Sequence, residues 1–402
     1  MKIVGVIAEY NPFHNGHQFH IQKAKELACA DAVIVVMSGN FVQRGVPAIM
    51  PKYVRTTSAL QEGASMVIEL PVCYATGTAE QFALGAVSIL DKLGCVDAIC
   101  FGSECGNITT LQTLSDVLFE EPAEYKTALQ SALRSGLSFP AARQTAMKAL
   151  YPEQDMHSIL EHPNNILAIE YLKALRKLNS NIIPLTIPRQ GAGYHDPQLQ
   201  EHYSSASAIR TQILANSYEE IKSQIPKASF ELYKEYFQTH SSVISDDCSL
   251  LLKYKLLSET KESLMLYSDV SEELANRICN CKNNYVCFNQ FCELLKTKEV
   301  TYSRISRALL HIILGIKKTH LTEIEYARVL GFCQKDVSIF TDIKNSTSLS
   351  LVSQSADVQY LSSKGKQMLD LDIYAANVYE SLVSYKNHTP YKNEFEHPMI
   401  RI

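Results

Sequence analysis

The first hundred residues alternate between short apolar runs and segments with apolar residues at helical spacing. This alternation restricts the fold more than any other feature of the chain. Four runs rich in Val and Ile predict buried strands, and the segments between them predict helices. We expect strands at residues 2–8, 32–37, 66–70 and 96–101, and helices from about residue 15, at 53–63 and at 78–93. Strands and helices that alternate in this way form a parallel sheet with helices on both faces. The sequence therefore predicts an α/β, Rossmann-like domain.

The alternation ends near Arg210. Residues 181–187 predict a fifth strand, whereas residues 211–335 predict successive helices without intervening strands. The remaining residues, 336–402, mix short apolar and polar stretches. We therefore expect two parts, namely a catalytic domain at residues 1–210 and a mainly helical C-terminal region at residues 211–402.

Charge and composition exclude several classes of protein. The net charge of −4 disfavours a sequence-blind coat on nucleic acid, which needs a basic surface, and no DNA partner is expected. No apolar run reaches the roughly 18 residues of a membrane span, and Glu9 interrupts the apolar stretch that a signal peptide needs. Eleven irregularly spaced cysteines are typical of reduced thiols. We expect a cytoplasmic protein with no membrane partner.

The first strand leads directly into a pair of histidines. The segment Asn11-Pro12-Phe13-His14-Asn15-Gly16-His17 lies where a strand ends and a helix begins. In open α/β sheets ligands bind at this edge, and the N–H groups of a helix N-terminus favour anions. Gly16 allows close approach of a phosphate, and two imidazoles can stabilise the charge on a leaving diphosphate. The alternative is that one histidine caps the helix and the other packs in the core.

A metal site has weaker support. His14 and His17 are three residues apart, whereas zinc proteases place their histidines four apart within a helix. The spacings of Cys279, Cys281, Cys287 and Cys292 do not match a pair separated by two residues. We expect packing roles for the cysteines and no metal cage made by the protein.

Several strings carry a family resemblance. His14-Asn15-Gly16-His17 resembles the HxGH motif of the nucleotidylyltransferase superfamily, related to the class I aminoacyl-tRNA synthetases, and Ser205-Ala206-Ser207-Ala208-Ile209-Arg210 resembles its second motif. Longer strings resemble the bacterial tRNA(Met) cytidine acetate ligase family, from residue 3 to about residue 210. They are Gly5 to His17, Met37-Ser38-Gly39-Asn40-Phe41-Val42-Gln43-Arg44-Gly45, Ile68-Glu69-Leu70-Pro71 and Gly191-Ala192-Gly193-Tyr194-His195-Asp196.

The resemblance implies a two-step reaction. Acetate would attack the α-phosphate of ATP, which gives acetyl-adenylate and diphosphate. The N4 amine of the wobble cytidine, position 34 of elongator tRNA(Met), would then take the acetyl group and become N4-acetylcytidine. The expected partners are ATP, Mg²⁺ bridging its phosphates, acetate and this tRNA. Acetate rests on the resemblance alone.

The resemblance also implies the site residues. His14 and His17 would be catalytic, and Ser207 with Arg210 would contact the far phosphates. The expected ATP site comprises Ile7, Ala8, Glu9, Tyr10, Asn11, Pro12, Phe13, His14, Asn15, Gly16, His17, Gln18, His20, Gly102, Asn165, Arg189, Gln190, Ser207 and Arg210.

The segment after the second strand is a candidate substrate loop. Its members Ser38, Gly39, Asn40, Gln43 and Arg44 could close over acetate or the adenylate, or form an ordinary loop with a surface arginine. Glu69 ends an apolar strand, where an unpaired carboxylate is costly. It therefore either pairs with a cation near the site or caps a helix.

Basic side chains of the helical stretches are candidates for contact with the tRNA backbone. Apolar residues of 302–316 would face inward and leave its basic side chains outward; a solvated helix face is the alternative. The candidates are Lys173, Lys177, Arg304, Arg307, Lys317 and Lys318.

Two other functions stay open at this stage. A small-molecule nucleotidylyltransferase that makes a nucleotide cofactor would use the same HxGH site. The residues after Arg210, nearly half of the chain, favour a macromolecular substrate instead. A binding module without catalysis is disfavoured by the presence of both histidines, Gly16, and Ser207 with Arg210.

Overall fold

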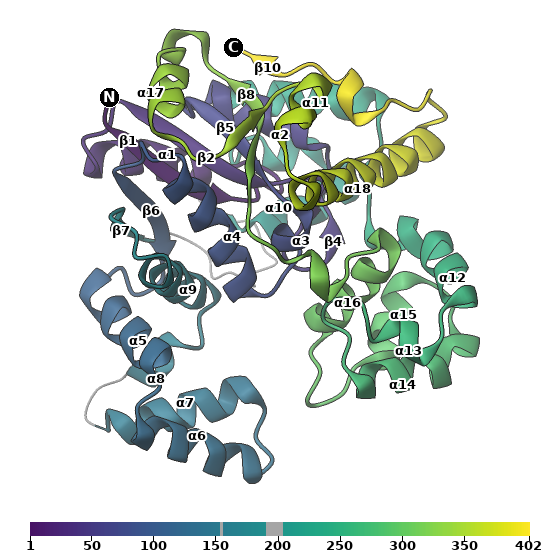
Figure 1. Cartoon of the computed structure of the whole chain (residues 1–402). Helices are drawn as coiled ribbons and strands as arrows, with labels where there is room; N and C mark the ends of the chain where they lie inside the picture. Colours follow the sequence, from purple (N-terminus) through teal and green to yellow (C-terminus); the bar gives the residue numbers. More distant parts are fainter. Residues whose placement is uncertain (153–155, 190–203) are drawn as a thin grey trace.

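The computed structural model describes residues 1–152, 156–189 and 204–402 (Figure 1). The strands are β1 (Ile3–Ala8), β2 (Ala32–Ser38), β3 (Phe41–Val42), β4 (Val46–Pro47), β5 (Met66–Leu70), β6 (Ala98–Ser103), β7 (Ile183–Pro188), β8 (Tyr326–Phe332), β9 (Ser350–Val352) and β10 (Ile400–Arg401). The α-helices are α1 (Asn15–Leu27), α2 (Lys52–Gln61), α3 (Val72–Ala75), α4 (Ala79–Lys92), α5 (Ile108–Glu120), α6 (Ala123–Arg134), α7 (Phe139–Leu150), α8 (Met156–Ile159), α9 (Pro163–Lys177), α10 (Ala206–Leu214), α11 (Lys227–Thr239), α12 (Ser249–Ser258), α13 (Lys261–Leu264), α14 (Glu272–Cys281), α15 (Phe288–Leu295), α16 (Tyr302–Leu314), α17 (Ile339–Ser346) and α18 (Ser363–Asn387).

One large sheet forms the centre of the molecule. Among the described residues it has eight strands in the order β10-β8-β5-β2-β1-β6-β7, with β9 beside β8. The strands β5, β2, β1, β6 and β7 are parallel, and Val6 of β1 lies between Val35 of β2 and Cys100 of β6. Strand β8 runs antiparallel to β5, so the sheet is mixed rather than purely parallel as expected.

Helices cover both faces of this sheet (Figure 1). Successive residues of a strand point to opposite faces, so Ile3 and Val4 of β1 belong to two separate cores. Ile3 packs with residues of α4 and α9, whereas Val4 packs with residues of α1, α2, α10 and α11. The predicted α/β architecture is confirmed.

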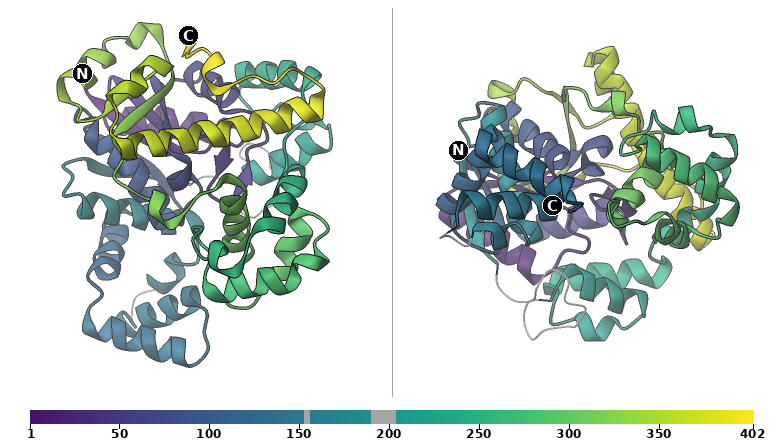
Figure 2. Two further views of the ribbon diagram at one scale, coloured as in Figure 1. Left: turned by 45° about the vertical axis from the view of Figure 1, so that its right-hand side comes forward. Right: turned by 90° about the horizontal axis from the view of Figure 1, so that it is seen from below.

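The C-terminal half contributes to the sheet as well as to the helices. Residues 326–332, expected to be helical, form the fully buried strand β8. The sheet therefore takes strands from both sides of the boundary expected near residue 210. Two helical projections, α6 with α7 and the lobe of α12–α16, extend from the same side of the sheet (Figures 1 and 2). No helix of the described chain has the length and apolar character to cross a membrane.

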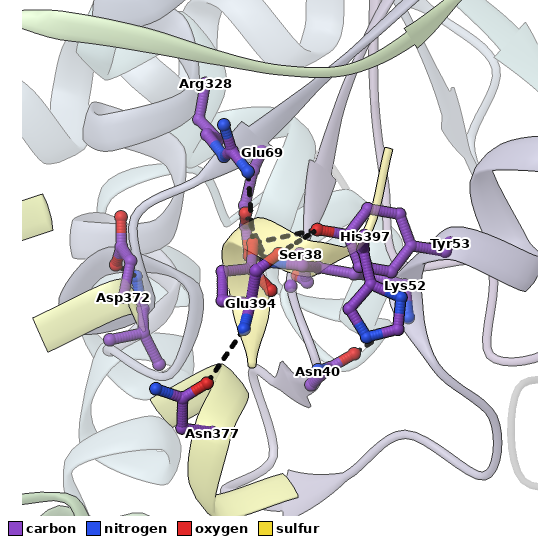
Figure 3. A network of polar contacts seen from close by, with 12 residues as sticks. Ser38, Asn40, Lys52, Tyr53, Glu69, Arg328, Asp372, Asn377, Glu394 and His397 are labelled. Atoms are coloured by element: carbon purple, nitrogen blue, oxygen red, sulfur yellow. Dashed lines mark hydrogen bonds and ion pairs between the residues drawn. The ribbon is translucent and has the colours of Figure 1, made fainter. Parts of the chain in front are cut away.

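A buried network of charges joins the C-terminal segment to the sheet (Figure 3). The ammonium group of Lys52, at 0% exposure, lies 2.7 Å from Glu69 Oε2 and 2.6 Å from Glu394 Oε1. Arg328 contacts the same Glu394 oxygen at 3.5 Å, and Tyr53 donates its hydroxyl to it at 3.0 Å. Two cations thus balance two carboxylates in the interior. Of the two alternatives for Glu69, a cation near the site or a helix cap, the structure shows pairing with a cation, Lys52, which does not line the cavity.

The network sets the charge states of its members. Burial alone would lower the pKa of Lys52, but the carboxylates of Glu394 and Glu69 raise it above its usual range. Burial opposes the charged form of Glu394 too, yet Lys52 and Arg328 hold the pKa of that carboxyl below its ordinary value. Lys52 lowers the pKa of Glu69 as well, but burial and the neighbouring Glu394 outweigh it and raise the pKa of Glu69 above its ordinary value.

Replacing Lys52 by Ala should destabilise the fold strongly, because it leaves two buried carboxylates with Arg328 as their remaining cation. Removing one partner of a buried ion pair costs about 3–5 kcal/mol. Urea denaturation checks the free energy of unfolding. The matched control is Lys23→Ala, since Lys23 pairs with Glu26 on the surface of α1. Equal losses in the two variants would contradict the role given to Lys52.

Candidate active site

A cavity lies at the carboxyl ends of β1 and β6. The chain continues from β1 to β2 and β5 on one side, whereas β6 and β7 lie on the other. Ligands of open α/β sheets bind where the strand order reverses in this way. The cavity is lined by Ile7, Ala8, Glu9, Tyr10, Asn11, His14, Gly16, His17, Phe19, His20, Val42, Gln43, Arg44, Val46, Phe82, Phe101, Gly102, Asn164, Leu167, Tyr171, Ile187, Pro188, Arg189, Ser204, Ser205, Ala206, Ser207 and Arg210.

The two histidines of the HxGH segment cap helix α1 and line the cavity at the same time. His14 is the N-cap, and its Nδ1 accepts the backbone N–H of Gly16 at 3.1 Å. His17 Nδ1 accepts the backbone N–H of His14 at 3.3 Å. The rings are stacked with centroids 3.7 Å apart. Capping and lining of the cavity are therefore not alternatives in this chain.

The capping bonds determine which ring atoms remain for chemistry. Burial, together with Arg189 and Arg210, lowers the pKa of His14 to about 3. Burial and the neighbouring His14 and His20 lower the pKa of His17 well below its usual value. Both rings are thus neutral near pH 7. Because each Nδ1 is an acceptor, each ring carries its proton on Nε2 and can donate from there.

Helix α10 brings a second N-terminus to the cavity. Ser205 caps this helix by accepting the N–H of Ala208 at 3.1 Å. Arg210, one turn into the helix, donates to Ser207 Oγ at 3.0 Å and to the carbonyl oxygen of Asn11 at 2.7 Å. The same arginine therefore ties α10 to the turn after β1. The two helix N-termini and two arginines, Arg210 and Arg189, make this end of the cavity suitable for phosphates.

Arg55 of α2 fixes the turns that follow β1 and β2. Its side chain is fully buried, and its guanidinium donates to the carbonyl oxygens of Glu9 at 2.6 Å, Ser38 at 3.1 Å and Met50 at 3.3 Å. It also bonds the carbonyl oxygen of Gly39. Burial lowers the pKa of Arg55 to about 10, which leaves it charged at neutral pH. The side chain of Arg55 thus fixes the positions of the turns after β1 and β2.

The hairpin of β3 and β4 forms another wall of the cavity and is fixed by helix α16. Ser306 of α16 donates its hydroxyl to the carbonyl oxygen of Gly45 at 2.9 Å. Gly45 has a φ of +74°, and a Cβ there would lie 2.4 Å from the backbone nitrogen of Arg307. Only glycine fits this contact. The hairpin that carries Gln43 and Arg44 therefore packs directly on the helical lobe.

Two comparisons with known sequences agree with this geometry. The family model described as HIGH Nucleotidyl Transferase matches residues 1–394. A curated tRNA(Met) cytidine acetate ligase from Thermoanaerobacter sp. (strain X514) is 40% identical over 406 residues and covers 100% of both chains. The chain belongs to the tRNA(Met) cytidine acetate ligase family. The predicted family and its ligase class are confirmed.

Solved structures support membership of this ligase family at the level of the fold. The crystal structure of Thermotoga maritima TmcAL (apo, form I) matches with a TM-score of 0.93 at 33% identity and covers 100% of both chains. The form bound with alpha-thio ATP matches with a TM-score of 0.90, also at 33% identity and full coverage. The predicted nucleotidylyltransferase fold is confirmed.

The structure brings most residues predicted for the ATP site of this ligase together around the cavity. The exceptions among the described residues are Pro12, Phe13, Asn15, Gln18 and Asn165. Asn15 and Gln18 bond elsewhere, to the carbonyl oxygen of Ser223 and to Glu62. Gln190 lies outside the described residues.

Helix α9 contributes residues that the sequence analysis missed. The Oδ1 atom of Asn165 accepts the N–H groups of Glu104 and Cys105, so its neighbour Asn164 lines the cavity instead. Leu167 and Tyr171 line the cavity as well. Residues 164, 167 and 171 are spaced three and four apart, which places them on one face of a helix. This helical spacing is the sequence signal that could have identified the three residues.

The candidate substrate loop divides into two parts. Gln43 and Arg44 line the cavity, whereas Ser38, Gly39 and Asn40 do not. Ser38 and Asn40 are buried, and Asn40 Oδ1 accepts the backbone N–H of Lys52 at 2.7 Å. Ser38 and Asn40 lie beside the buried charge network (Figure 3).

The candidate tRNA contacts also divide. The expectation that Arg307 faces outward is wrong, because it is 8% exposed and its Nε donates to Asp269 at 2.8 Å. Helix α16 packs against α12, α15, α18 and β4, which buries most of its surface. Lys177, Lys317 and Lys318 are exposed, Arg304 is half-buried, and Lys173 pairs with Glu170 at 2.8 Å.

The depressed histidine pKa values predict an acid-sensitive fold. Burial and Arg189 lower the pKa of His20 to about 4, against an ordinary 6.5. Between these values the unfolded chain binds a proton that the folded chain does not. The free energy of unfolding is therefore complete above pH 6.5 and falls as the pH falls towards 4, by about 1.4 kcal/mol per pH unit for each such histidine.

Urea denaturation between pH 7 and pH 4.5 tests this dependence. The variant His20→Gln should show a shallower loss of stability with acid than the unmodified chain, because one linked proton has been removed. Identical slopes would contradict the lowered pKa of His20.

Proposed function

We propose that this chain is an ATP-dependent ligase that activates acetate as acetyl-adenylate and acetylates N4 of the wobble cytidine of elongator tRNA(Met). The observation that carries the proposal is the neutral histidine pair facing a cavity with two helix N-termini, in a chain whose relatives bear this enzyme's name. The ATP analogue named for the Thermotoga maritima structure agrees with a nucleotide in this cavity.

The first step needs stabilisation of charge on the leaving diphosphate. As an acetate oxygen attacks the α-phosphorus, the bond to the bridging oxygen breaks and diphosphate departs with the electron pair. His14 and His17 would donate from Nε2 to phosphate oxygens, since their Nδ1 atoms are committed to capping α1. Arg210 and Ser207 would hold the far phosphates. Donors aimed at developing charge in this way lower the barrier.

Magnesium would accompany the nucleotide rather than occupy a protein cage. No group of three or more His, Cys, Asp or Glu side chains able to hold a metal ion occurs in the described part of the chain. Mg²⁺ commonly keeps several waters and binds through substrate phosphates. When bound it would neutralise phosphate charge, while Arg210 and Arg189 would add the protein's positive charge.

The helical lobe and α9 would contact the tRNA. Lys177 and Lys317 are exposed, whereas the ammonium of Lys318 donates to the carbonyl oxygens of Met265 and Val270. Arg304 on α16 is half-buried. Residues 211–402 would thus form the main RNA-binding region next to a catalytic domain at residues 1–210.

The decisive experiment is mass spectrometry of nucleosides from elongator tRNA(Met) incubated with protein, ATP, Mg²⁺ and acetate. N4-acetylcytidine should form only when every component is present. Acetate-dependent AMP without a modified nucleoside would contradict the acceptor, and the absence of both products would contradict the ligase.

The variant His17→Asn separates catalysis from capping. Asn Oδ1 can replace His17 Nδ1 as acceptor for the His14 N–H, but the Nε2 donor is lost. Turnover should fall by about 10²–10³-fold, as for other lost transition-state donors. A thermal melt serves as the control for folding. Unchanged turnover would show that His17 has only a structural role.

The double variant Lys177→Ala, Lys317→Ala tests the RNA surface. Loss of two phosphate contacts should weaken tRNA binding and reduce the slope of log K against log salt by about 2. Filter binding at several salt concentrations measures both. Lys23→Ala on α1 is the control. An unchanged slope in the double variant would show that these lysines are solvated and do not contact the tRNA.

A further inference from the structure

Glu9 is a carboxylate in a cavity that otherwise suits anions. It follows β1 directly, and among the described residues it is the acidic side chain that lines the cavity. Acetate and triphosphate are both anionic, so a charged carboxylate would repel them. A group of this kind at this place needs a positive or hydrogen-bond-donating partner at some stage of the reaction.

The geometry of Glu9 leaves one of its oxygens available. Oε1 accepts the backbone N–H of Gln43 at 2.7 Å, which fixes the carboxylate against the β3–β4 hairpin. Oε2 accepts no hydrogen bond from the residues that the structure describes. The guanidinium of Arg55 is taken up by backbone carbonyls, and Arg210 bonds Ser207 and Asn11. Neither arginine forms a salt bridge with Glu9.

The partner that fits Glu9 is an amino group. The exocyclic N4 of cytosine is a pure hydrogen-bond donor, and Glu or Asp is the side chain that accepts from it in nucleic-acid recognition. The amine must also lose a proton when it becomes an amide. A carboxylate that accepts its hydrogen bond is in position to take that proton.

We propose that Glu9 binds the N4 amine of the acceptor cytidine and acts as the general base of acetyl transfer. This inference rests on the proposed function. In the step, N4 attacks the carbonyl carbon of acetyl-adenylate, the new N–C bond forms, and the C–O bond to the phosphate breaks. AMP leaves with that electron pair, and one N4 proton passes to Glu9 Oε2 and then to solvent.

The histidines are less suited to this role. His14 and His17 use Nδ1 as acceptors in the cap of α1 and carry protons on Nε2, so neither offers a free lone pair. His20 also lines the cavity, and its buried Nε2 has no hydrogen-bond partner among the described residues. Its pKa of about 4 makes it a weak base, however. Burial instead raises the pKa of Glu9, although the Gln43 N–H and the nearby Arg210, Arg55 and Arg44 oppose the rise.

The test separates acetyl transfer from adenylate formation in the full chain. Hydroxylamine attacks acyl-adenylates without a protein base and gives acetohydroxamate and AMP, so it reports the first step alone. The variant Glu9→Gln keeps an oxygen that can accept the Gln43 N–H but lacks the charge of the base. N4-acetylcytidine formation should fall by about 10²–10⁴-fold, the usual contribution of a general base. Acetohydroxamate formation should fall far less.

Three comparisons make the result decisive. Glu9→Asp keeps a carboxylate and should recover part of the transfer that Glu9→Gln loses. The ratio of N4-acetylcytidine to acetohydroxamate should be higher in His20→Gln than in Glu9→Gln. If that ratio falls in His20→Gln and not in Glu9→Gln, the proposal is overturned. A parallel loss of both products in Glu9→Gln also overturns it, because Glu9 would then serve adenylation or the hairpin. If the unmodified chain makes acetohydroxamate but no N4-acetylcytidine, the proposed acceptor itself is wrong.

Discussion

The active site depends on a buried guanidinium that holds backbone carbonyls. Arg55 donates to the carbonyl oxygens of Glu9, directly after β1, and of Ser38 and Gly39 at the end of β2. A buried charge is stable only when hydrogen bonds satisfy it, and here the satisfying groups are the turns themselves. The position of Glu9 and the start of the substrate loop therefore follow from one side chain of α2.

The histidine pair shows how one motif combines folding and chemistry. The rings cap α1 through Nδ1, and that bond fixes which nitrogen is left to donate. Low pKa values keep both rings neutral, so they act as fixed dipoles rather than as titrating groups. Positive charge towards phosphate comes instead from Arg210 and Arg189. The cavity thus combines two neutral imidazole donors with two arginines close enough to lower the pKa of His14.

Local patterns predicted much of this arrangement, since they depend on residues close in sequence. The apolar runs predicted β1, β2, β5 and β6, and the strand-to-helix junction located His14 and His17. Long-range contacts were beyond that reasoning. Strand β8 pairs antiparallel with β5, and Lys52 meets Glu394 across 342 positions of the chain. Neither pairing has a local periodicity. Arg307 likewise carries a charge whose partner, Asp269, no spacing rule indicates.

The contact between Gly45 and α16 restricts how a large substrate could bind to the lobe and the cavity at the same time. The hairpin that lines the cavity and helix α16 of the lobe meet closely: Gly45 lies against the backbone of Arg307, and the Ser306 hydroxyl donates to the Gly45 carbonyl oxygen. Overlap of main-chain atoms opposes a closer approach of the two elements, and the Ser306 hydrogen bond opposes their separation. The distance between the lobe and the cavity is therefore fixed. An RNA bound to the lobe would place in the cavity only a nucleotide that lies at this fixed distance from the bound part. Selection by that distance would therefore come before selection by base.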